Sequence, residues 1–185
     1  MTQKQWEKIL KENLKKADKL GKGIDPGIRE VVAVFNALGF KTTASCEGHL
    51  DHGVAGPWID FESEVDTEKI GNKAQEIILR AQKLSDTGNS RKANILFKKA
   101  HLLFKKYEKP HLKERKKMAD FLDEFYKNRE VDFHTRLHIQ GFRHSRLENQ
   151  GAAYQDIQSP STCKSNLKKY QKEMKEFSNF LKSKL

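Results

Sequence analysis

Residues 40–62, "FKTTASCEGHLDHGVAGPWIDFE", carry the clearest strand pattern in this chain. The stretch begins with a β-branched run at 40–46 and ends with "PWIDFE" at 57–62, and both runs are typical of β-strands. The loop between them holds three glycines, which tight turns favour because glycine tolerates positive φ. The stretch therefore predicts two strands joined by a loop that gathers one cysteine and two histidines.

The segment before this hairpin predicts two helices. Apolar residues at three-and-four spacing form a single stripe along 3–20, which is typical of an amphipathic helix. The run at 26–38 has almost no polar face, so we expect a buried helix there. Asp25 is the expected N-cap of this second helix, with Pro26 at its first position.

A Lys-rich helical insertion is predicted after the hairpin, at 66–128. Its helical runs are separated by "DTGNS" and by Pro110, and they lie at 66–86, 90–108 and 111–128. We therefore expect an inserted helical hairpin or trio at 66–128, and a single α+β core formed by 1–65 and 129–185.

The chain returns to strand patterning after the insertion. Apolar and polar residues alternate along 131–140, Gly141 permits a turn, and "RHSRLENQG" at 143–151 is the expected partner. A closing helix is predicted from apolar residues at heptad spacing between Leu167 and Leu181. The expected fold is α+β, with a small, mostly antiparallel sheet packed by helices.

The composition indicates where the protein is located and which classes of partner are expected. No stretch approaches the roughly 18 apolar residues of a membrane span, so no membrane partner is expected. Cys46 and Cys163 are too few for a secreted disulfide framework, and a reducing cytoplasm is the expected location.

The net charge of +11 invites a nucleic-acid interpretation. Residues 1–65 carry nine Lys or Arg against ten Asp or Glu, a net charge of −1. Residues 66–130 carry seventeen against ten, and residues 131–185 carry ten against five, so the basic excess lies on the helices. Binding of RNA or another acidic partner by these helices is an alternative function that we do not favour, because no aromatic-interleaved basic strand accompanies the lysines.

The loop after the first strand carries residues that could bind a metal or act in catalysis. Cys46, His49 and His52 stand three apart, and Cys and His are ligands that suit zinc. Without a metal, Cys46 would be the catalytic thiol and His49 its acid or base. Ser45, Glu47 and Gly48 would then complete the ligand-binding loop. The competing interpretation is a buried cysteine beside two surface histidines.

The later strand pair offers a second polar cluster. His134, Arg136 and His138 share one face of a strand by period two, and Arg146 would lie on its neighbour, with His144 and Glu148. An arginine guanidinium binds phosphate or carboxylate through two parallel hydrogen bonds. An ordinary solvated sheet face is the alternative.

Residues 23–61 resemble a conserved hypothetical family of bacteria, seen mostly in small-genome candidate phyla. The likeness rests on "FNALG", "SCEGH" and "PW" in that order, with the later "RLENQG" resembling the family's C-terminal strand. It covers about a third of the chain, and the family has no assigned activity. "HGVAGPWID" also looks something like the metal motif of zinc D-Ala-D-Ala carboxypeptidases, but its His52-to-Asp60 spacing is one residue too long and no "W-x-H" follows.

These residues lead to one expected function. The loop at 45–52 and the polar face at 134–148 would form one pocket for a small anionic or nucleotide-like ligand. Whether the protein also acts on the ligand, and whether zinc takes part, are left open by the residues. A zinc-dependent hydrolase is the third possibility, after the RNA-binding alternative.

Overall fold

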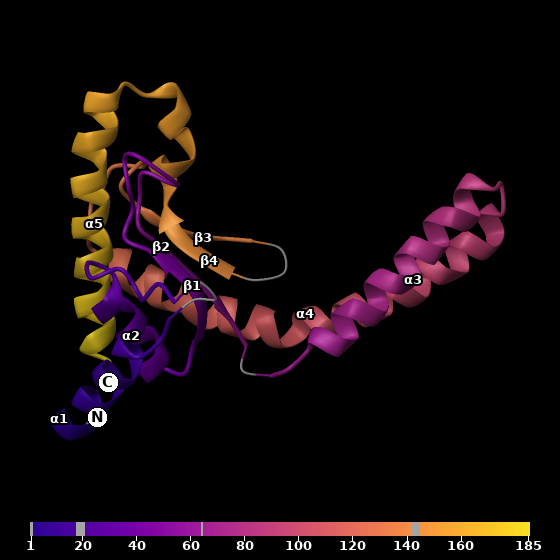
Figure 1. Cartoon of the computed structure of the whole chain (residues 1–185), viewed down its shortest axis with the longest axis horizontal. Helices are drawn as coiled ribbons and strands as arrows, with labels where there is room; N and C mark the ends of the chain where they lie inside the picture. Colours follow the sequence, from indigo (N-terminus) through magenta and orange to yellow (C-terminus); the bar gives the residue numbers. More distant parts are fainter. Residues whose placement is uncertain (1, 18–20, 64, 142–144) are drawn as a thin grey trace. The chain divides into compact units, whose positions relative to one another are not determined.

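The structure is a computed structural model, and it describes residues 2–17, 21–63, 65–141 and 145–185. Within these ranges the chain has the predicted α+β fold, with five α-helices, one 3-10 helix and a four-stranded antiparallel sheet (Figure 1). The helices are α1 (Gln3–Leu14), α2 (Arg29–Ala37), α3 (Glu68–Asp86), α4 (Ser90–Tyr126), η1 (Gln150–Ile157) and α5 (Pro160–Lys182). The strands are β1 (Lys41–Cys46), β2 (Trp58–Glu62), β3 (Leu137–Gln140) and β4 (Ser145–Asn149).

The sheet has the strand order β1-β2-β4-β3, so β1 and β3 form its two edges. The predicted hairpin is present, because Cys46 of β1 pairs with Trp58 of β2. Trp58 in turn pairs with Glu148 of β4, and Glu148 with His138 of β3. Side chains of directly paired residues point to the same face of a sheet. Cys46, Trp58, Glu148 and His138 therefore form one row across one face.

The opposite face of the sheet carries the hydrophobic core. Ile59, Phe61 and Leu147 are completely buried there, as expected for positions that alternate with the polar row. They belong to one apolar cluster with residues of α1, α2, α5 and the C-terminal part of α4. The ring centroids of Phe35, on α2, and Phe61 lie 5.9 Å apart in an edge-to-face arrangement, which is favourable for aromatic pairs.

The chain divides into two compact units. The first is formed by residues 1–62 and 115–185, and the second by residues 63–114. The C-terminal end of the predicted insertion, at 115–126, thus lies in the first unit. Its Met118, Leu122, Phe125 and Tyr126 are members of the core cluster, which explains why this part of the helical run packs with the sheet.

The second unit pairs α3 with the N-terminal part of α4. We expected a break at Pro110, but α4 continues through it. A proline removes one backbone hydrogen bond from a helix while keeping a helical φ, so packing can hold the helix together. The next residue, His111, is 4% exposed and accepts a hydrogen bond of 3.3 Å from the Ser63 amide.

Two further predicted elements differ in extent. The alternating run at 131–140 is a strand only from Leu137, because the Asp132 side chain accepts a hydrogen bond from the Thr135 amide at 3.0 Å and forms a turn. The predicted first helix ends at Leu14, and its last positions, 18–20, lie outside the described residues. None of the helices in the described ranges combines the length and apolar character of a membrane span.

Candidate functional site

A cavity of about 690 Å³ lies along edge strand β1, within the first unit. All of residues 42–46 contribute to its wall, so the predicted "SCEGH" loop begins at the cavity. Residues 15–17 and 22–25, which lie between α1 and α2, also line the cavity. The lining also includes the charged, histidine and tryptophan side chains of Lys15, Lys16, Lys22, Asp25, His49, His52 and Trp58.

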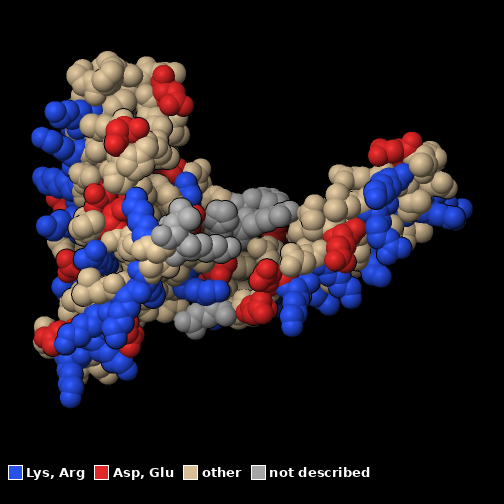
Figure 2. All heavy atoms as spheres, viewed as in Figure 1, with Lys and Arg blue, Asp and Glu red and all other residues tan. Residues whose placement is uncertain are grey.

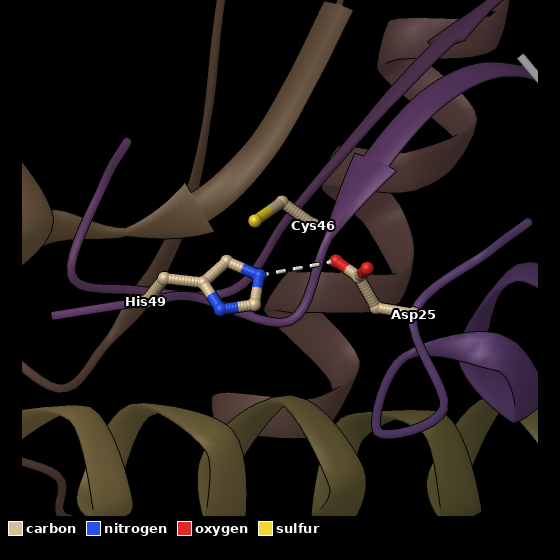
Figure 3. Close-up of side chains that lie close together, drawn as sticks. All are labelled: Asp25, Cys46 and His49. Carbon is tan, nitrogen blue, oxygen red and sulfur yellow. Dashed lines mark hydrogen bonds and ion pairs between the residues drawn. The ribbon is translucent and has the colours of Figure 1, made fainter. Parts of the chain in front are cut away.

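Three side chains converge in this cavity. Figure 3 shows Asp25 from the loop before α2, Cys46 from the end of β1 and His49 from the loop after β1. The Nε2 atom of His49 lies 3.4 Å from Oδ2 of Asp25. Sγ of Cys46, Nε2 or Nδ1 of His49 and a carboxylate oxygen of Asp25 all lie within 4.8 Å of one another.

Reciprocal hydrogen bonds hold the two loops together. The Glu47 amide donates to Oδ2 of Asp25 at 3.3 Å, and the Gly27 amide donates to Oε2 of Glu47 at 2.6 Å. The loop after β1 is closed by the His49 amide, which donates to the Val54 carbonyl at 3.1 Å. Each carboxylate thus satisfies a backbone amide of the opposite loop, which fixes Asp25 beside Cys46.

Asp25 has a different role from the one that its sequence context predicted. We expected it to cap the second helix, but that helix begins at Arg29 with Ile28 as its N-cap. The Asp25 carboxylate instead accepts hydrogen bonds from the other loop. The "DPG" at 25–27 is a turn sequence as well as a helix start, and this was the available signal.

The protonation of the cluster follows from its burial. Burial raises the pKa of the Cys46 thiol, and the nearby negative charge of Asp25 raises it further. Burial also raises the pKa of Asp25, but hydrogen bonds from the Glu47 amide and from His49 outweigh this effect and leave that pKa lowered. Near neutral pH the metal-free site therefore holds a neutral thiol beside a carboxylate. This argues against Cys46 as a free thiolate nucleophile.

His52 lies in a different group from Cys46. Its ring stacks on His49, with centroids 4.3 Å apart, and its Nδ1 lies 2.9 Å from Oδ1 of Asp51. Two sets of candidate metal ligands occur among the described residues, Asp25 with Cys46 and His49, and His49 with Asp51 and His52. The expected triplet of Cys46, His49 and His52 is thus divided between two sets that share His49.

The other loop residues have mainly structural roles. Ser45 lines the cavity, whereas the contacts of Glu47 and Gly48 are within the loops. The carboxylate of Glu47 is occupied by the Gly27 amide. Gly48 has φ of +87°, and its amide donates a hydrogen bond of 3.4 Å to Sγ of Cys46.

Arg146 is committed to an ion pair. Its Nε and Nη2 donate to the two carboxylate oxygens of Asp60 at 2.7 and 2.9 Å, and its guanidinium lies 3.9 Å from the Trp58 ring centroid. We expected Arg146 to bind an anionic ligand, but this fork already binds a buried carboxylate. Trp58 lines the cavity, and Arg146 contacts the Trp58 ring.

The second polar cluster does not extend the cavity. His138 shares a sheet face with Cys46 but lies on the opposite edge strand, about 14 Å away across three strand spacings. His134 contacts the Tyr154 ring, and the Arg136 guanidinium lies 4.4 Å from the Tyr126 ring centroid. These three residues are absent from the described lining of the cavity. His144 lies outside the described residues.

Lys15, Lys16, Lys22 and Trp58 were not predicted as site residues. The lysines belong to a Lys-rich segment in which composition alone does not distinguish one lysine from another. Comparison of the chain with protein-family models, curated proteins and solved structures found no match. The resemblance of residues 23–61 to a bacterial family therefore stays a prediction.

Proposed function

We propose that the protein binds a small anionic, nucleotide-like ligand in the cavity beside β1. The observation that carries this proposal is the charge of the lining, because Lys15, Lys16 and Lys22 face a single described carboxylate, that of Asp25. Lysine ammonium groups attract phosphate as point charges. The volume of about 690 Å³ lies within the range of roughly 300–1,000 Å³ that small-molecule sites occupy.

The three lysines that line the cavity, Lys15, Lys16 and Lys22, differ in whether they form an ion pair. Nζ of Lys22 lies 4.0 Å from Oδ1 of Asp25, so part of its charge is balanced. Lys15 and Lys16 are exposed and form no ion pair with any described residue. They are therefore the cations that a ligand phosphate would contact first.

Trp58 and β1 supply the remaining groups that a nucleotide requires. One face of the Trp58 ring is covered by the Arg146 guanidinium, which holds the ring in place. An aromatic ring in a ligand site stacks on a nucleobase, an interaction that contributes about 1–3 kcal/mol in nucleic-acid complexes. Thr43 and Ser45 add hydroxyl groups from the edge strand.

The test is a calorimetric titration of the protein with AMP and, separately, with inorganic phosphate. We expect the wild type to bind AMP and the Lys15→Ala, Lys16→Ala double variant to bind it at least about tenfold more weakly. The Lys8→Ala, Lys11→Ala double variant is the matched control, since it removes equal charge from α1 outside the cavity. Trp58→Leu should weaken AMP binding more than phosphate binding. Equal losses in the two lysine variants, or no binding of either probe, would refute the proposal.

A second candidate function, binding of single-stranded RNA, is favoured by one feature of α4. Basic pairs recur every seven residues at 91–92, 98–99 and 105–106, and all six side chains are exposed. Seven residues make nearly two helical turns, so the pairs form a stripe with a repeat of about 10.5 Å. Figure 2 shows that Lys and Arg side chains gather along one side of the hairpin formed by α3 and the N-terminal part of α4.

Salt dependence and matched charge removal distinguish the two candidates. If the protein binds RNA, a variant with glutamine in place of four lysines should have a lower oligonucleotide affinity and a weaker salt dependence. The four positions are Lys98, Lys99, Lys105 and Lys106. Gln at Lys164, Lys168, Lys169 and Lys175 removes the same charge from α5 and should have a smaller effect. Equal losses from both variants would indicate attraction by net charge alone.

A further inference from the structure

We propose that Asp25, Cys46 and His49 bind one zinc ion, with the fourth coordination position open to the cavity. The three residues supply oxygen, sulfur and nitrogen ligands, and each of these donor types occurs in zinc sites. The proposal goes beyond the anion-binding function and does not depend on it, because metal binding is measured with no organic ligand present.

The distances suit a tetrahedral ion after a small contraction. Zinc–ligand bonds of about 2.0–2.3 Å place the ligand atoms of a tetrahedron about 3.3–3.8 Å apart. His49 Nε2 and Asp25 Oδ2 are already 3.4 Å apart, and the longest separation in the group does not exceed 4.8 Å. The contraction therefore concerns Sγ of Cys46, because the His49–Asp25 pair already has a tetrahedral spacing.

Hydrogen bonds from the backbone already orient two of the ligands. The Gly48 amide donates to Sγ of Cys46 at 3.4 Å, and the Glu47 amide donates to Oδ2 of Asp25 at 3.3 Å. Donors of this kind orient ligands and tune a metal site. The side chains of Asp25 and His49 are only 14% and 22% exposed, so their positions are restrained by packing.

The alternative set of ligands around His52 is less suited to a stable site. The side chains of His52 and Asp51 are 57% and 83% exposed, and that set lacks a sulfur ligand. Lys22 lies 4.0 Å from Asp25, but its side chain is 66% exposed and has room to move away from a bound cation. The Asp25 set is therefore the one that we assign.

An open position follows from where the ligands lie. Asp25, Cys46 and His49 all line the cavity, so a water molecule or an anionic group has access to an ion held between them. Three protein ligands with a free position are typical of catalytic zinc sites, whereas structural sites have four protein ligands. A zinc ion here would add positive charge at the end of the cavity and would reinforce binding of an anion.

Metal content and cobalt spectra test the proposal. Full-length protein without a histidine tag is stripped with a chelator, dialysed and titrated with Zn²⁺ or Co²⁺. We expect one ion per chain, and with Co²⁺ the near-ultraviolet charge-transfer band of a thiolate ligand. Cys46→Ser should abolish this band, and Asp25→Asn and His49→Gln should each weaken zinc binding at least about tenfold.

Two control variants and a folding measurement complete the experiment. Cys163→Ser and His52→Gln should keep the affinity and the cobalt band, and circular dichroism reports whether each variant is folded. If Cys46→Ser does not fold, the band in the wild type and the loss in Asp25→Asn still decide the matter. A wild type that binds no zinc, a cobalt complex without the thiolate band, or a His52→Gln loss as large as that of Asp25→Asn would overturn the assignment.

Discussion

The Tyr126 hydroxyl donates a hydrogen bond of 3.0 Å to Oε1 of Glu173 and accepts one of 2.8 Å from the Leu137 amide. One buried side chain of α4 thereby joins α5 to edge strand β3. The Glu173 carboxylate also contacts Arg129, with Nη2 at 3.0 Å from Oε2. Burial raises the pKa values of both Tyr126 and Glu173.

Tyr126→Phe should lower the free energy of unfolding by about 1–3 kcal/mol, because it removes the acceptor of the buried Leu137 amide and one of the donors to Glu173. Urea denaturation followed by circular dichroism measures the change. Tyr154→Phe is the matched control, because Tyr154 is 42% exposed and its ring contact with His134 would be kept. Equal stability of the two variants would contradict this role for Tyr126.

His138 should make stability depend on pH. Burial lowers its pKa below the usual 6.5, so the unfolded chain binds the proton more readily than the folded one. The resulting contribution to stability is present above pH 6.5 and is lost as the pH falls through the lowered pKa. His138→Gln should therefore have a flatter curve of unfolding free energy between pH 8 and about 5.5. His101→Gln, at an exposed position, should follow the wild type, and a His138→Gln curve parallel to the wild type would contradict the prediction.

Gly48 should tolerate substitution less well than Gly53. Both have positive φ, +87° and +69°, so alanine at either costs about 1–2 kcal/mol of backbone strain. A Cβ atom at Gly48 would also lie 2.7 Å from the Gly56 carbonyl carbon and from Leu167 Cδ1, whereas no atom of the described residues lies within 4 Å of a Cβ at Gly53. We expect Gly48→Ala to lose about 1–3 kcal/mol more than Gly53→Ala in thermal or urea denaturation. Similar losses would show that the loop can shift to accept a side chain.

Arg146 should be needed for stability. Arg146→Ala removes the guanidinium from Asp60, which is 6% exposed, and we expect a loss of roughly 2–4 kcal/mol, at or below the range for fully buried pairs. The double variant Asp60→Leu, Arg146→Met should lose less, because it removes the buried charge as well. Arg80→Ala, on the exposed side of α3, is the control. A double variant less stable than Arg146→Ala would contradict this account.

The two units predict different outcomes for two deletions. Removing residues 63–114 and joining Glu62 to Arg115 through a short Gly/Ser linker should preserve cooperative unfolding, because the core residues of the first unit remain. A short linker is enough to join the two ends. The Ser63 amide lies 3.3 Å from Nδ1 of His111, and His111 lies about one helical turn before Arg115. Removing 66–128 also deletes Met118, Leu122, Phe125 and Tyr126 from the core and should abolish the transition. The same result from both deletions would contradict the division.

Much of the secondary structure could be predicted from local patterns. The β-branched run before Cys46 and the run from Trp58 became paired strands, and the apolar heptad positions of the last helix, such as Tyr170 and Phe177, are buried. Periodicity succeeds here because burial of one face is a property that each element carries in its own sequence. It failed at Asp132, where a side chain that bonds to its own backbone ended the strand pattern.

Local sequence patterns were enough to place Cys46 and His49 together at the end of a strand, where a tight loop begins. Three other features depend on tertiary packing: Asp25 joins these residues, three lysines border the same cavity, and His138 lies at the far edge of the sheet. Strand order and the meeting of two loops depend on packing among distant segments, and a local pattern holds no information on them. Asp25 lies more than twenty residues before Cys46, and hydrogen bonds between the two loops, rather than any shared element, bring these side chains together.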